Sequence, residues 1–153
     1  MTLSLTTKTL NNGLKIPIIG LGVYKSAPEE CYATSLLALK QGYRHIDSAA
    51  FYKNEKEVGK AVRDSGIPRS EIFVTTKLFL TDADTDVTDA VTKQFQQSFD
   101  NLGIDYIDLY LMHAPFVGKR LEAWKVMESF VKDGRVKSIG ISNFGIHHVG
   151  IYI

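Results

Sequence analysis

The feature that most constrains the fold is a repeat in which short apolar stretches alternate with segments of helical pattern. Five such stretches, roughly 30 residues apart, predict strands at 18–21, 44–47, 72–77, 107–113 and 136–141, with a helix between each pair. Strands joined through helices run parallel, with right-handed crossovers. Runs such as IFV and IGI fit a sheet that is covered on its faces. The sequence therefore predicts an α/β domain built on a parallel (β/α) repeat.

The segments between the strands carry apolar residues at helical spacing. The first helix is predicted to begin at Pro28 and end before Gly42, and Asn54 with Glu57 resembles a capping pair at the start of the second. Ahead of the first strand, Asn12-Gly13 predicts a hairpin with a type I′ turn. The positions expected to face the core are Tyr32, Ala33, Leu36, Leu37 and Leu39 in the first helix, Val87, Val91, Phe95, Phe99 and Leu102 in the third, and Leu121, Trp124, Met127 and Val131 in the fourth.

The number of repeat units sets the architecture. A closed (β/α)₈ barrel takes eight strands and about 250 residues, whereas this chain has five predicted strands in 153 residues. A doubly wound sheet would fit the length but expects a Gly-rich turn after its first strand, and GLGVYKSAPEE lacks the third glycine. We therefore predict a single domain over 1–153, a partial TIM barrel of about five of its eight βα units, preceded by an N-terminal hairpin.

Composition excludes several classes of protein. Hydrophobic residues make up 44% of the chain and charged residues 23%, as in a globular domain. The net charge is +1 and the basic residues are scattered, which predicts no nucleic-acid partner. The absence of a long apolar run or a signal-peptide pattern predicts no membrane association. A single cysteine, Cys31, fits a reducing compartment and is expected to be a packed, inert thiol, so the predicted location is cytoplasmic.

Four polar residues stand at or just after the ends of predicted strands. Asp47, Lys77 and His113 each close a strand, and Tyr52 follows Asp47 by five positions. The carboxyl ends of parallel strands converge on one face, where α/β proteins build active sites. A phenol can donate a proton, an ammonium beside it favours that release, a carboxylate holds the ammonium, and an imidazole can orient a carbonyl group. The sequence therefore predicts an acid–base site at this end of the sheet. The adjacent pair His147-His148 predicts no metal site.

Four segments of the chain carry a family resemblance. GYRHIDSAAFYKNE, TTKL, DLYLMHAP and KSIGISNF resemble, in order and spacing, the signature regions of the aldo-keto reductases, which are NADP-dependent oxidoreductases on a (β/α)₈ barrel. The match runs from about Leu10 to His148 and covers the first half of that barrel. The resemblance implies NADPH-dependent reduction of an aldehyde or ketone, with Tyr52 as proton donor, Lys77 and Asp47 as its activating pair, and His113 orienting the carbonyl.

The same resemblance assigns further residues to binding. It implies that Ser142 and Asn143 hold the nicotinamide carboxamide, and that Gly22, Val23 and Asp47 also line the cofactor site. Tyr24 and Ala114 are implied in the substrate pocket. Val23-Tyr24 stand where many members have Thr-Trp, and Ala114 stands where Trp is usual, so the pocket is expected to differ in shape and to be wider.

The length of the chain leaves alternatives open. In the family, three more strands follow, and they supply an aromatic stacking on the nicotinamide, a glutamine, and a basic cluster for the 2′-phosphate. NADP(H) binding is therefore expected to be weak or lost in this chain. One alternative is a dimeric acid–base catalyst that isomerises, dehydrates or cyclises a carbonyl compound. Another is a catalytically silent half-barrel. We expect a homodimer that covers the open side of the half-barrel.

Overall fold

The structure is a computed structural model that describes residues 6–149. Its helices and strands follow the predicted alternation. In chain order, the elements are β1 (Thr7–Thr9), β2 (Lys15–Pro17), β3 (Leu21–Gly22), α1 (Pro28–Lys40), β4 (His45–Asp47), the 3₁₀ turn η1 (Ala50–Tyr52), α2 (Glu55–Asp64), η2 (Arg69–Glu71), β5 (Phe73–Leu78), α3 (Val87–Leu102), β6 (Ile107–Met112), α4 (Arg120–Lys132), β7 (Val136–Ile141) and α5 (Ile146–Val149).

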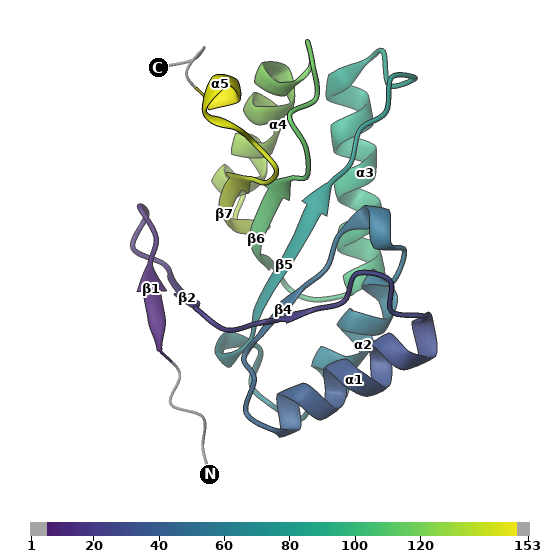
Figure 1. The fold of residues 1–153 in the computed structure, drawn as a ribbon, viewed down its shortest axis with the longest axis vertical. Coiled ribbons are helices and arrows are strands. Elements are labelled where there is room, and N and C mark those ends of the chain that lie inside the picture. Colours follow the sequence, from purple (N-terminus) through teal and green to yellow (C-terminus); the bar gives the residue numbers. More distant parts are fainter. Residues whose placement is uncertain (1–5, 150–153) are drawn as a thin grey trace.

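A five-stranded parallel sheet forms the centre of the molecule. Its strands lie in chain order, β3-β4-β5-β6-β7, and every neighbouring pair is parallel. The helices also pack in chain order, α1 on α2, α2 on α3 and α3 on α4, and together they flank the sheet (Figure 1). A doubly wound sheet would reverse its strand order at a switch point. The unreversed order instead gives the partial TIM-barrel arrangement predicted from the repeat.

The main core lies between the sheet and the helices. Phe95 of α3 stacks on Phe130 of α4 with ring centroids 3.9 Å apart, and the Tyr110 ring of β6 meets Phe95 edge-on at 5.3 Å. Side chains alternate faces along a strand. Because Tyr110 faces the helices, its neighbours Leu109 and Leu111 face the opposite side, where both are half-buried. That opposite face corresponds to the interior of a barrel.

The hairpin and the first strand differ from prediction. Strands β1 and β2 pair antiparallel as expected, but Gly13 has φ +86° while Asn12 does not have a positive φ. A type I′ turn needs positive φ at both central residues, so the predicted turn type is wrong. The predicted buried strand at 18–21 is also wrong, because only Leu21–Gly22 pair with β4. Ile18 and Ile19 are 59% and 60% exposed, since no strand lies beyond β3 among the described residues.

Several predicted core positions are wrong in detail. Helix α1 buries Cys31, Ser35, Ala38 and Leu39, whereas Ala33 and Leu37 are exposed. Helix α4 buries Ala123, Met127 and Phe130, and Leu121 is 51% exposed. Both errors have the same cause: helical spacing shows that a helix is amphipathic, but the neighbours available to it decide which residues of the apolar stripe are covered. Helix α3 buries the predicted stripe, with Phe99 half-buried.

The predicted capping pair of α2 does not form. Asn54 occupies the N-cap position, but its side chain makes no capping hydrogen bond to the helix backbone. Its amide bonds instead to the β3–α1 loop and to Ser48. No helix among residues 6–149 is long and apolar enough to cross a membrane.

Candidate active site

The carboxyl ends of β4, β5 and β6 carry the predicted site residues. Asp47 is the last residue of β4, Lys77 is next to last in β5, and His113 follows β6 directly. Tyr52 ends the 3₁₀ turn η1, which follows β4. The strand register aligns these ends, with Gly22 beside Asp47 and Lys77 beside Leu111. The structure therefore gathers Asp47, Tyr52, Lys77 and His113 at one end of the sheet, as the repeat predicted.

Lys77 is the centre of this cluster. Its side chain is 6% exposed, and its Nζ donates to Asp47 Oδ1 at 2.5 Å, to the Ser48 carbonyl oxygen at 2.9 Å and to the Tyr52 hydroxyl at 3.4 Å. A buried ammonium is stable only when its donors are paired and a counter-charge is near. Asp47 supplies the counter-charge, and the remaining donors point at Ser48 and at Tyr52. The ammonium charge is thus held beside the phenol oxygen.

His113 lies edge-on to the Tyr52 ring, with centroids 5.6 Å apart. Burial lowers the pKa of His113, the Lys77 ammonium lowers it further, and Asp47 opposes both effects weakly. The imidazole is therefore neutral at physiological pH and carries one N–H. Its Nδ1 is buried and has no hydrogen-bond partner among the described residues. A neutral imidazole beside a phenol can donate one hydrogen bond to a carbonyl oxygen.

The loop after β7 lies beside His113. The Ser142 backbone N–H donates to the Met112 carbonyl, and Asn143 Nδ2 donates to the His113 carbonyl at 2.8 Å and to Ser142 Oγ at 3.2 Å. Asn143 has φ +60°, in the left-handed region that asparagine tolerates better than most residues. The family resemblance implied that Ser142 and Asn143 lie at the site, and in the structure Asn143 is hydrogen-bonded to the backbone of His113.

Three aromatic side chains that the sequence pattern did not predict at the site lie beside the cluster. Phe79 lies 5.8 Å from His113 and 4.6 Å from Phe51, and Phe116 lies 6.1 Å from Phe79, all between ring centroids. Tyr24, which the family resemblance placed in the substrate pocket, packs on Tyr52 at 4.9 Å and is 55% exposed. These aromatic residues follow the ends of different strands. Their position after a strand end is therefore the one sequence signal that could have predicted them at the site.

The remaining residues singled out from the sequence differ in how far they are buried. Ala114 follows His113 directly and is half-buried, and Gly22 is exposed, with open space where a Cβ would stand. Val23 is only 1% exposed, and its N–H donates to the Asp47 carbonyl, so its side chain belongs to the core. Cys31 is fully buried, and burial raises the pKa of its thiol. Among residues 6–149, no cluster of His, Cys, Asp and Glu could hold a metal ion.

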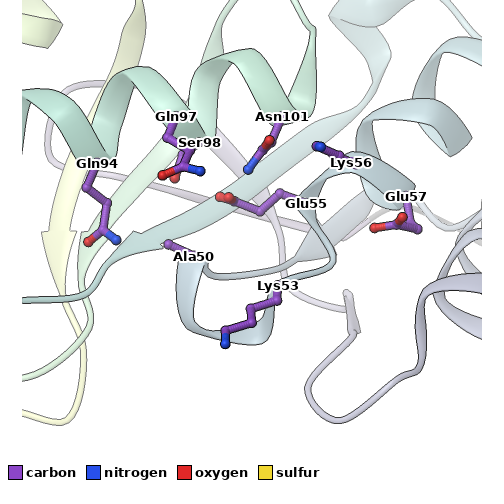
Figure 2. Close-up of a pocket in the computed structure, with 9 residues that line it drawn as sticks. All are labelled: Ala50, Lys53, Glu55, Lys56, Glu57, Gln94, Gln97, Ser98 and Asn101. Atoms are coloured by element: carbon purple, nitrogen blue, oxygen red, sulfur yellow. The ribbon is translucent and has the colours of Figure 1, made fainter.

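A buried carboxyl lies close behind the site. Glu55, the first residue of α2, is 3% exposed, and its Oε1 accepts a hydrogen bond from Thr76 Oγ1 at 2.6 Å, next to Lys77 in β5. Burial raises the pKa of Glu55. The carboxyl borders a polar pocket of about 430 Å³ between α2 and α3, where it points toward α3 (Figure 2). The pocket is lined by Ala50, Lys53, Glu55, Lys56, Glu57, Gln94, Gln97, Ser98 and Asn101.

Known proteins resemble this chain over most of its length. The family model described as "Aldo/keto reductase family" matches residues 18–151. Glyoxal reductase of Bacillus subtilis (strain 168) is 42% identical over 144 residues, covering 94% of this chain and 51% of that protein. Glycerol 2-dehydrogenase (NADP(+)) of Saccharomyces cerevisiae is 41% identical over 170 residues, covering 92% of this chain and 53% of that protein. The chain spans about half the length of the curated relatives it matches.

A solved structure shares the same backbone arrangement. The crystal structure of an aldo/keto reductase from Brucella melitensis superposes with a TM-score of 0.90 at 42% sequence identity. The superposition covers 97% of this chain and 57% of that one. The backbone arrangement described above thus occurs in a solved structure whose similarity extends over nearly all of the present sequence.

Proposed function

The chain belongs to the aldo/keto reductase family of oxidoreductases, and we propose that it serves NADPH-dependent reduction of an aldehyde or ketone, with Tyr52 as the proton donor. The observation that carries the proposal is the buried Lys77 ammonium, held by Asp47 at 2.5 Å and directed at the Tyr52 hydroxyl at 3.4 Å. A buried lysine needs one counter-charge for stability, but stability alone does not require a tyrosine hydroxyl as a further partner.

Each residue of the cluster has a defined task in this reaction. Tyr52 gives its hydroxyl proton to the carbonyl oxygen as the C=O double bond becomes the C–O single bond of the alcohol. The Lys77 ammonium stabilises the phenolate that this transfer leaves, and Asp47 keeps the ammonium in place. The neutral His113 donates a hydrogen bond to the same oxygen and polarises the carbonyl. Bound NADPH supplies the hydride that reduces the carbonyl carbon.

The loop after β7 offers groups that fit the nicotinamide end of this cofactor. A primary carboxamide needs an acceptor for its N–H groups and a donor for its oxygen. Asn143 uses its Nδ2 on His113 and Ser142, and its Oδ1 has no hydrogen-bond partner among the described residues, so it can accept. The Ser142 hydroxyl can donate. Both residues would therefore hold the carboxamide close to the end of β6.

The substrate proposed is a carbonyl compound with an apolar or aromatic substituent. Phe51, Phe79 and Phe116 form an aromatic wall beside His113, and Tyr24 borders Tyr52. Aromatic rings bury large apolar areas and contact flat apolar groups well. Relatives bear the names glyoxal reductase and aldehyde reductase, which supports a carbonyl substrate.

The experiment that tests the proposal is aldehyde-dependent NADPH oxidation by the 153-residue chain and by Tyr52→Phe. Loss of one acid group is expected to lower turnover by about 10²- to 10⁴-fold. Tyr32→Phe is a matched control, because it removes a tyrosine hydroxyl that donates to Asp64 on the helix surface. Wild-type turnover in Tyr52→Phe would refute the role of Tyr52, and no aldehyde-dependent oxidation by the wild-type chain would refute the activity.

A further inference from the structure

Asn54 joins three segments of the chain through one buried side chain. The residue is 1% exposed. Its Nδ2 donates to the carbonyl oxygens of Val23 at 2.9 Å and Ser26 at 3.3 Å, both in the β3–α1 loop. Its Oδ1 accepts from Ser48 Oγ at 3.0 Å, just after β4. An asparagine at an N-cap normally accepts from the helix backbone, and here it does not. The amide is therefore committed to the two loops that flank the site.

Both loops contact the reacting groups directly. Ser48, held by Asn54 through its hydroxyl, presents its backbone carbonyl to Lys77 Nζ at 2.9 Å. The β3–α1 loop, held at Val23, carries Tyr24, whose ring packs on Tyr52 at 4.9 Å. Tyr52 itself lies on the short turn between Ser48 and Asn54. One side chain thus fixes both ends of the segment that contains the proton donor.

The hydrogen bond between Lys77 and Tyr52 tolerates little displacement of either residue. Lys77 Nζ and the Tyr52 hydroxyl are 3.4 Å apart, near the upper limit for a hydrogen bond. A displacement of a few tenths of an ångström in the turn would break it. An aspartate or serine at position 54 could cap a helix equally well, but neither can donate to two carbonyls while accepting from a hydroxyl. The pattern of contacts requires an amide.

We propose that Asn54 is a positioning residue, which orients Ser48 and the β3–α1 loop so that the Lys77 ammonium stays directed at Tyr52. Its catalytic consequence rests on the proposed reductase function, but its effect on Lys77 does not. The test therefore reads Lys77 first, by the nitrogen-15 signal of its side-chain ammonium and the rate at which those hydrogens exchange with water. Absence of the signal in Lys77→Arg identifies it.

In Asn54→Ala the Lys77 ammonium is expected to exchange faster by about tenfold, the effect of losing one hydrogen bond of ordinary strength. Asn12→Ala is the matched control, because Asn12 also donates a side-chain amide hydrogen bond to a backbone carbonyl, that of Lys137, away from the site. The control should leave the Lys77 signal unchanged. Ser48→Ala removes only the hydroxyl that donates to Asn54 and should shift the same signal, even if Asn54→Ala does not fold.

An unchanged Lys77 signal in a folded Asn54→Ala or in Ser48→Ala would overturn the proposal. Where the wild-type chain reduces an aldehyde, Asn54→Ala is expected to lower kcat by about 10- to 100-fold, as misplacement of a catalytic group does, with a much smaller change in KM. An equal change in kcat and KM would count against positioning. A wild-type chain without turnover would refute the proposed function alone, because the Lys77 measurement needs no turnover.

Discussion

Replacing Glu55, the first residue of α2, by Gln should remove a pH-dependent decrease in the free energy of unfolding. Glu55 is 3% exposed and begins α2, with one carboxyl oxygen accepting from Thr76 at 2.6 Å. Glutamine has the same shape and keeps an oxygen for Thr76, but it cannot ionise. Burial raises the pKa of the Glu55 carboxyl above its ordinary value of 4.5. The substitution therefore isolates the cost of that charge in the pocket of Figure 2.

The direction of the pH dependence follows from whether Glu55 is protonated in the folded and in the unfolded state. Between pH 4.5 and the raised pKa, the folded state keeps a proton on Glu55 that the unfolded state has already released. The stability of the wild-type chain therefore falls as pH rises through that window, by at most about 1.4 kcal/mol per pH unit for one proton. Below the window both states are protonated, and variant and wild type should differ by no more than about 1 kcal/mol, a typical hydrogen-bond difference.

The assay is urea unfolding of the wild-type chain and Glu55→Gln at several pH values from 4 to 8. The difference between the two free energies of unfolding cancels all other titrating groups, including Asp108, whose pKa burial also raises. The free energy of unfolding of Glu55→Gln should increase relative to that of the wild type as pH rises, and the difference should then level off. A difference that is flat across the range would refute the reasoning, because it would mean that Glu55 ionises in the folded chain as easily as in water.

Three further predictions follow from the packing. Lys77→Met leaves the Ser48 carbonyl without its partner and should lower the free energy of unfolding by about 1–3 kcal/mol; urea unfolding equal to wild type would contradict this. Phe130→Ala opens the stack on Phe95 and should cost about 3–5 kcal/mol, and a loss below 1 kcal/mol would show that the core closes over the gap. The predicted homodimer should sediment at twice 17.1 kDa, since Leu109 and Leu111 are only half-buried on the face opposite the helices; a species of 17.1 kDa alone would contradict it.

Local pattern sufficed for the order of the elements and for the residues at the ends of the strands. The alternation of apolar strands with helices predicted the parallel sheet, because the crossover rule leaves one hand and one direction for each unit. The position of Asp47, Lys77 and His113 at one end of the sheet could be predicted from sequence, because each stands at or just after the end of an apolar strand. A buried lysine needs a counter-charge, so Asp47 could be predicted from sequence as the partner of Lys77.

Tertiary structure alone decided which side chains meet. Asn54 looked like a helix cap, but its amide lies under two loops that are distant in sequence and bonds to them instead. Leu37 and Leu121 lie on apolar stripes yet are exposed, because burial depends on the neighbouring element and not on spacing. Phe51, Phe79 and Phe116 join one wall only after three loops converge. Sequence determines which conformation each segment prefers, whereas the contacts between distant segments arise only when the sheet brings their ends together.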